Sequence, residues 1–137
     1  MSAGRAARVL RWSLQAGAAY FVCVAIAHWA GVKVPGLFVY YNIPSYAYQD
    51  KGIGILSFGW AMFLFAASKE LSILPAIIAA GMAGILGFSI INLSGEVAFL
   101  AGSKGVAGFW VVVIGLAAYL AWVIVWWQVS GRRHGRA

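Results

Sequence analysis

The sequence has very little charge. Of its 137 residues, 9% are charged and three are acidic. A soluble globular domain carries about 25% charged residues, so this chain lacks the polar groups that would cover a water-facing surface. Hydrophobic residues make up 64% of the chain, and its mean hydropathy is +0.89. The shortage of charge excludes a soluble fold and predicts an integral membrane protein.

Cysteine is nearly absent, and the common catalytic motifs are missing. The single cysteine, Cys23, excludes a disulfide within the chain, and its apolar neighbours favour a packing role. The sequence contains no G-x-S-x-G, H-E-x-x-H, C-x-x-C or Walker pattern. His28 and His134 fall on opposite sides of the predicted membrane, which argues against a haem held by both. The sequence assigns no catalytic residue, leaves any cofactor unknown and favours a protein that is not an enzyme.

Acidic residues are scarce, whereas basic residues give a net charge of +7. Six of the ten basic residues lie in two short tails, namely Arg5, Arg8, Arg11, Arg132, Arg133 and Arg136. Nucleic-acid binding needs a contiguous basic face, whereas basic tails beside apolar segments set the orientation of membrane proteins. We therefore expect the lipid bilayer, and no nucleic acid, as a partner.

Four apolar segments are long enough to cross a bilayer, whose core of about 30 Å needs ~20 helical residues. They lie at about residues 12–30, 46–68, 75–95 and 106–127. The second reaches this length by including Asp50, with Ser45 as its N-cap, and the third begins at Pro75, a favoured first position. Their continuous apolarity excludes the alternating strands of a barrel. The predicted fold is all-α, a single four-helix transmembrane domain over residues 1–137.

The basic residues also predict the orientation of the four spans. An even number of spans places both ends of the chain on one side of the membrane. That side would hold the six tail arginines and Lys69, whereas the other two loops hold Lys33, Lys51 and Lys104. The positive-inside rule therefore predicts cytoplasmic N and C termini. Arginine-rich tails with short loops favour a multi-pass protein of the bacterial inner membrane.

Small and aromatic residues form stripes along the predicted helices. Small residues recur every four positions at Ala19, Cys23 and Ala27, at Ala80 and Gly84, and at Ala83 and Gly87. Such stripes let helices approach closely, either within the bundle or between copies in a homo-oligomer. An aromatic stripe at Tyr119, Trp122 and Trp126 favours packing at the membrane interface, with a flat pigment or quinone as the alternative.

The few polar residues of the spans fall at one depth, near their outer ends. His28 ends the first span, Asp50 begins the second, and Glu96 ends the third if that helix continues through Leu100. Ionisable groups at such positions are candidates for function. Helical spacing would place Asn92 and Glu96 on one face, under a tyrosine-rich loop. The predicted ligand or proton-relay candidates are His28, Asp50, Asn92, Glu96, Tyr46 and Tyr48.

Several functions fit this polar layer. Its groups are either satisfied by nearby lysines, tyrosines and water, or form a proton relay or a small-solute site. A metal held by one imidazole and two carboxylates has acceptable ligands, but no supporting spacing, so no metal site is predicted. We favour a non-catalytic subunit or packing partner of a larger membrane assembly. The alternatives are an oligomeric small-solute or proton-coupled transporter or channel, and a membrane enzyme acting on a lipid or quinone.

Overall fold

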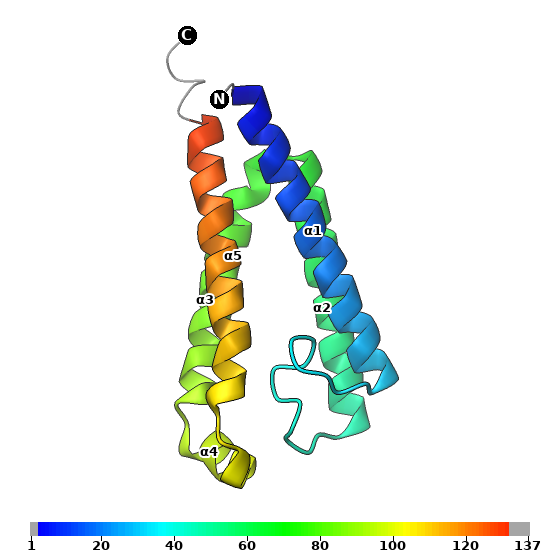
Figure 1. Ribbon diagram of the computed structural model, residues 1–137. Coiled ribbons are helices and arrows are strands. Elements are labelled where there is room, and N and C mark those ends of the chain that lie inside the picture. Colours follow the sequence, from blue (N-terminus) through cyan, green and yellow to red (C-terminus); the bar gives the residue numbers. More distant parts are fainter. Residues whose placement is uncertain (1–2, 132–137) are drawn as a thin grey trace.

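A computed structural model describes residues 3–131, and all regular structure in that range is helical (Figure 1). The elements are α1 (Ala3–Ala30), α2 (Ala47–Lys69), η1 (Leu71–Ile73), α3 (Leu74–Asn92), α4 (Gly95–Ala101), η2 (Gly102–Lys104) and α5 (Ala107–Gly131). Among the described residues, α1, α2, α3 together with η1, and α5 are long and apolar enough to cross a membrane, which confirms the predicted all-α fold. The predicted tail residues Arg132, Arg133, His134 and Arg136 lie outside the described residues.

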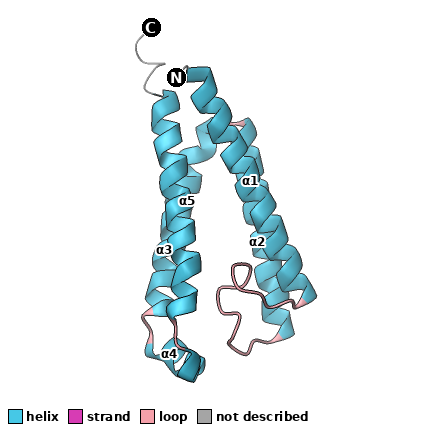
Figure 2. Cartoon of the chain, viewed as in Figure 1, coloured by secondary structure: helices cyan, strands magenta, loops and turns pink. Residues whose placement is uncertain are grey.

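The four long helices form two pairs that diverge from one end of the molecule (Figure 1). Helix α1 packs along α2, α5 packs along α3, and α1 and α5 join the two pairs. We call the end where α1 begins and α5 ends the terminal end. The loop of residues 31–46 and the short helix α4 lie at the opposite end, which we call the loop end (Figure 2). The helices therefore meet at the terminal end and separate toward the loop end.

The main hydrophobic core lies at the terminal end. Leu10 and Leu14 of α1 are fully buried and pack with Leu74 of α3 and Val123 of α5. These residues come from three helices, so they hold both pairs together. In a bilayer, where lipid is as apolar as leucine, packing contacts rather than hydrophobic transfer would stabilise such a junction.

Gly17 allows α1 and α5 to meet beside this core. A Cβ atom at Gly17 would lie 2.1 Å from the Tyr119 hydroxyl oxygen, so any larger residue would force the Tyr119 ring out of its place against α1. The Tyr119 hydroxyl donates to the Ser13 carbonyl at 3.1 Å, and the Trp122 indole donates to the Ser13 hydroxyl at 2.9 Å. These two residues of the aromatic stripe on α5 therefore pack and hydrogen-bond against α1.

Most residues of the predicted small-residue stripes do not lie in helix contacts within the chain, and their alternative role, contact between copies in a homo-oligomer, stays a prediction. On α1, Ala27 is buried, but Ala19 and Cys23 are exposed. The close contact of α1 with α2 instead uses Gly54, where a Cβ would lie 3.1 Å from the Ala25 carbonyl oxygen. On α3, three of the four stripe residues, Ala80, Ala83 and Gly84, are exposed, and Gly81 is the glycine that approaches α5, at Leu120. Small residues lie on several faces of these helices, so their spacing does not identify the contact face.

The start of α2 differs by one residue from the predicted one. Tyr46, not Ser45, occupies the N-cap, and its backbone N–H donates to the Gln49 side-chain oxygen at 3.4 Å. Ser45 lies one residue before the N-cap, so its hydroxyl does not cap α2. Ser45 donates instead to Asp50 at 2.8 Å.

Helix α3 ends at Asn92 rather than continuing through Leu100. Ser94 then caps α4, accepting a hydrogen bond from the Val97 backbone N–H at 3.3 Å. Serine is a preferred N-cap, and it starts a new helix here. The expectation that Glu96 shares a helical face with Asn92 is therefore wrong.

Candidate functional site

A cavity of about 590 Å³ lies between the two helix pairs. This volume is within the range of roughly 300–1,000 Å³ that small-molecule sites occupy. Apolar side chains from the four long helices make most of its wall, including Phe21, Trp60, Phe88 and Leu116. Along α2 the lining runs from Asp50 to Leu64, which corresponds to about 21 Å at the helical rise per residue. The cavity is therefore elongated along the bundle.

The cavity opens sideways between α2 and α3. Leu56 of α2 lines it and is nevertheless 70% exposed, and the lining residues Ala80 and Gly84 of α3 are exposed as well. Helices α2 and α3 make few contacts with each other, in contrast to α1 with α2. This gap is therefore the open side of the cavity.

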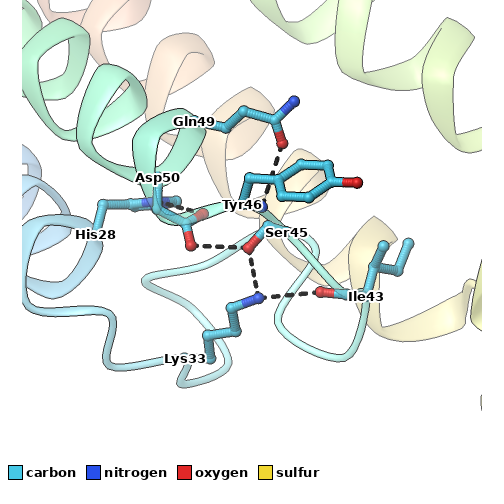
Figure 3. A network of polar contacts seen from close by, with 7 residues as sticks. All are labelled: His28, Lys33, Ile43, Ser45, Tyr46, Gln49 and Asp50. Atoms are coloured by element: carbon cyan, nitrogen blue, oxygen red, sulfur yellow. Dashed lines mark hydrogen bonds and ion pairs between the residues drawn. The ribbon is translucent and has the colours of Figure 1, made fainter.

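The loop end of the cavity carries its imidazole, carboxylate and amide groups, from His28, Asp50 and Gln49. His28 and Asp50 are each 6% exposed, and Figure 3 shows their side chains next to each other. The His28 Nδ1 and Asp50 Oδ1 atoms are 3.9 Å apart, too far for a direct hydrogen bond. The buried Nδ1 atom has no hydrogen-bond partner among the described residues. An unpaired buried polar atom costs about 1–3 kcal/mol, and Asn42 Oδ1, Asn92 Nδ2 and Trp126 Nε1 share this state in the described part of the chain.

The second carboxylate oxygen of Asp50 is held by the loop (Figure 3). The Ser45 hydroxyl donates to Asp50 Oδ2 at 2.8 Å. The Lys33 ammonium donates in turn to the Ser45 hydroxyl and, at 3.1 Å, to the Ile43 carbonyl. This chain of contacts places a positive charge behind Asp50 on the side away from His28. It leaves Oδ1 as the carboxylate oxygen that faces the imidazole.

Aromatic residues of the loop cover the site and reach the second helix pair. The Phe38 ring stacks on the His28 ring, with 3.6 Å between centroids and 19° between planes. The Tyr40 hydroxyl donates to the Asn92 side-chain oxygen of α3 at 3.2 Å. Burial raises the pKa of the Tyr40 phenol, which keeps it protonated as a donor. The loop therefore spans the gap between the pairs at the loop end.

The structure brings together two of the six predicted site residues, His28 and Asp50. Asn92 is buried and faces Tyr40 of the loop. Glu96 is exposed in α4, and Tyr46 and Tyr48 are 70% and 72% exposed and stack on each other.

The same placement bears on the metal hypothesis. Within residues 3–131, no group of three or more His, Cys, Asp or Glu side chains is close enough to hold a metal ion. His28, Asp50 and Glu96 are therefore not brought together as one ligand set.

Sequence reasoning missed the parts of the site that the loop supplies. The sequence indicated that Lys33 would neutralise an acidic side chain. It did not predict that Lys33 reaches Asp50 through the Ser45 hydroxyl. The sequence offered little indication of this contact, since a serine that follows a proline is first interpreted as a helix N-cap. The stacking of Phe38 on His28 and the contact of Tyr40 with Asn92 depend on how the loop folds back, and no spacing rule predicts them.

The arrangement is amphipathic. The ionisable side chains His28 and Asp50 lie at one end of the cavity, and a mostly apolar channel leads away from them, open to the side. Its lining also includes Ser57 and Tyr119. Such a site can bind a molecule with a small polar head and a long apolar chain. It supplies one imidazole and one carboxylate oxygen to that head.

Comparisons with protein families, curated proteins and solved structures add no relative to this description. No family model matches the chain, and neither a curated protein nor a solved structure is significantly similar to it.

Proposed function

We propose that this chain is a multi-pass membrane protein that binds a lipid-like amphiphile in the cavity between its two helix pairs. The observation that carries the proposal is the shape and polarity of the cavity: about 590 Å³, apolar along its length, and polar at the end that holds His28 and Asp50. The ligand class is that of the lipid-or-quinone alternative drawn from the sequence. The proposal assigns binding and no reaction.

The position of the opening supports a ligand that arrives from the bilayer. The gap between α2 and α3 is bordered by exposed apolar residues such as Ile53 and Leu56, which would face hydrocarbon in a membrane. At the loop end, the stacked ring of Phe38 and the partly buried Tyr40 cover the polar site. An apolar chain would enter sideways, while its head remains under the loop.

A substitution that fills the cavity tests the proposal. Gly84 lines the cavity, and a Cβ added there would meet nothing within 4 Å, so Gly84→Leu places a side chain in the cavity without a backbone clash. Gly87, on the same helix, has equally open surroundings and is not among the lining residues. Gly87→Leu is therefore a matched control for helix propensity and added bulk.

The measurement is mass spectrometry of the lipids that remain bound to each purified variant. We expect a lipid species that is enriched over the bulk membrane in the wild type and in Gly87→Leu, and lost in Gly84→Leu. Identical bound lipids in all three proteins, in bulk proportions, would show that the cavity selects nothing.

We also propose that the terminal end faces the cytoplasm of a bacterial cell, in the inner membrane. Arg5 and Arg8 are exposed at this end, and Arg11 donates to the carbonyl oxygens of Ser68 and Lys69, where α2 ends. Basic residues gathered at one end favour the cytoplasmic side. Alkaline phosphatase fused after the last residue should be inactive, and a fluorescent protein at the same place should be bright. The opposite pattern would invert the topology.

A second candidate function is that of a subunit in a larger membrane assembly, or of one copy in a homo-oligomer. The favouring observation is α3, of which only 6% of the most apolar stretch is buried within the chain. Exposed small residues on α3, such as Ala83, would permit close approach of another helix. Chemical crosslinking from a cysteine at Ala83 in native membranes tests it, with Cys23 replaced by serine. A crosslinked species supports the subunit, whereas monomer alone argues against it.

A further inference from the structure

We infer that the head group of the bound amphiphile is a neutral hydroxyl, held between His28 Nδ1 and Asp50 Oδ1. The inference rests on the proposed function, because it names the ligand class of the same cavity. It concerns long-chain alcohols and other hydroxyl-ended amphiphiles, as opposed to amphiphiles with phosphate, carboxylate or ammonium heads.

The distance between the two atoms fits one bridging oxygen. Nδ1 and Oδ1 are 3.9 Å apart, so one oxygen can lie at a hydrogen-bonding distance of about 2.8 Å from both. With the proton on Nδ1, the imidazole donates to this oxygen, and the hydroxyl donates to the carboxylate. A hydroxyl has one donor and two acceptor positions, so both protein atoms are satisfied by the same group.

Among the described residues that line the cavity, His28 has a buried nitrogen without a hydrogen-bond partner. This atom is Nδ1, and His28 is more than nine-tenths buried. Asp50 is equally buried, and its other oxygen, Oδ2, is already taken by Ser45. The Phe38 ring covers one face of the imidazole, which leaves the ring edge for a ligand.

Charge selects against the other head groups. A phosphate or carboxylate would meet the Asp50 carboxylate at close range, and the cation linked to it, Lys33, is engaged by Ser45 and the Ile43 carbonyl. An ammonium would pair with Asp50, but it carries three donors and no acceptor. At least one donor would remain unpaired beside apolar walls, where a charged group loses its hydration.

The chain of the ligand extends from this head toward the terminal end. The cavity follows α2 for about 21 Å, past Trp60 as far as Leu64. One leaflet of a bilayer core is about 15 Å deep, half of roughly 30 Å. A chain that fills the cavity would therefore reach past the bilayer midplane, which favours a long chain over a short one.

Three probes that share one chain test the head group. Hexadecanol, hexadecylamine and hexadecanoate are each added to the full-length protein in phosphatidylcholine nanodiscs, and the bound fraction is measured by native mass spectrometry. We expect hexadecanol to bind at least about tenfold more tightly than either charged probe. Equal binding of all three, or a preference for a charged probe, would overturn the inference.

Two variants assign the preference to the two residues. His28→Phe keeps an aromatic ring against Phe38 and removes Nδ1, so hexadecanol binding should fall about tenfold, as expected for a lost hydrogen bond to a buried partner. Asp50→Asn keeps the shape of the side chain and removes its charge, so hexadecanoate should gain at least about tenfold relative to hexadecanol. Ser57→Ala, a buried polar position deeper in the cavity, is the control and should change neither ratio.

The outcomes separate the inference from the proposed function. If Gly84→Leu weakens all probes while the wild type binds them equally, the cavity binds chains and the hydroxyl inference fails. If Gly84→Leu weakens none, the proposed function itself fails. If His28→Phe does not fold, Asp50→Asn alone decides, because an unchanged ratio of hexadecanoate to hexadecanol contradicts a head group at Asp50.

Discussion

The terminal end and the loop end of the bundle are built from similar residues but packed differently. At the terminal end, Leu10, Leu14 and Leu74 are fully buried at the junction of three helices. At the loop end, helix residues such as Leu56 line a cavity and stay exposed, and a loop rather than a helix spans the gap. One end holds the helices together, and the other leaves space between them.

This difference separates stability from binding within one small chain. Contacts at the terminal end are dry and apolar, so substitutions there should act on the free energy of unfolding. Contacts at the loop end combine the polar site with a small apolar cluster, in which the loop packs against Val97 and Phe109. Substitutions at the polar site should therefore act on the ligand and on the loop.

Leucine truncation should distinguish the two ends most strongly. Leu14→Ala removes a fully buried side chain and should destabilise the protein by about 2–4 kcal/mol through lost packing. Leu56→Ala, at a 70% exposed position on the cavity wall, should change stability by roughly 0.5 kcal/mol or less. Thermal unfolding of both variants in the same detergent measures the difference. Equal losses would mean that the two ends are packed alike.

The glycine at the helix junction gives the next effect. Gly17→Ala forces a methyl group against the Tyr119 hydroxyl and should cost about 1–3 kcal/mol of stability. Gly115→Ala, on α5 with no atom within 4 Å, should instead stabilise slightly, since alanine favours a helix by about 1 kcal/mol over glycine. The midpoints of thermal unfolding should therefore move in opposite directions. A shift of both unfolding midpoints in the same direction would show that the close contact at Gly17 does not require glycine.

The contact between the loop and α3 should contribute less. Tyr40→Phe removes the hydrogen bond to Asn92, and a bond of this kind contributes about 0.6 kcal/mol between membrane helices. We expect faster hydrogen exchange in residues 31–46 with little change in global stability. Tyr41→Phe, whose hydroxyl makes no hydrogen bond within the described residues, should leave exchange unchanged. Matching exchange in the two variants would show that Tyr40 does not fasten the loop.

The smallest effect concerns pH at the turn between α2 and α3. Hydrogen bonds from the Ser72 side chain and backbone N–H lower the pKa of Glu70 below its ordinary value of 4.5, with a smaller contribution from the Arg11 charge. A lowered folded pKa contributes stability that is fully present above the unfolded pKa and is lost as pH falls through the folded value. The wild type should therefore lose thermal stability below pH 4.5 more steeply than Glu70→Gln. Parallel pH profiles of the two proteins would contradict this.

The fold could be predicted from the sequence because its signals are local. Four continuous apolar segments of membrane-spanning length need only composition and length, and Pro75 marked the start of α3 within one residue. The end of α3 was harder, since Ser94 is a cap only when the chain turns there. The helix contacts were not predictable, because glycines and alanines occur on several faces and three-dimensional packing selects Gly17 and Gly54 among them.

The candidate site could be predicted in part. His28 and Asp50 stood out because ionisable groups are rare in these helices, and both prove to be buried at the loop end. The cavity could not be foreseen, since it depends on the divergence of the helix pairs. The contact from Lys33 through Ser45 to Asp50 depends on the path of the 16-residue loop 31–46. The sequence of this loop has no helical or strand periodicity from which that path could be predicted.

The most direct test of the central claim is a density map of the protein in lipid nanodiscs. We expect elongated density between the α1–α2 and α3–α5 pairs, with its polar end between His28 and Asp50 and its chain along α2 toward Leu64. Helix α2 packed directly against α3, with no density and no space between the pairs, would contradict the account.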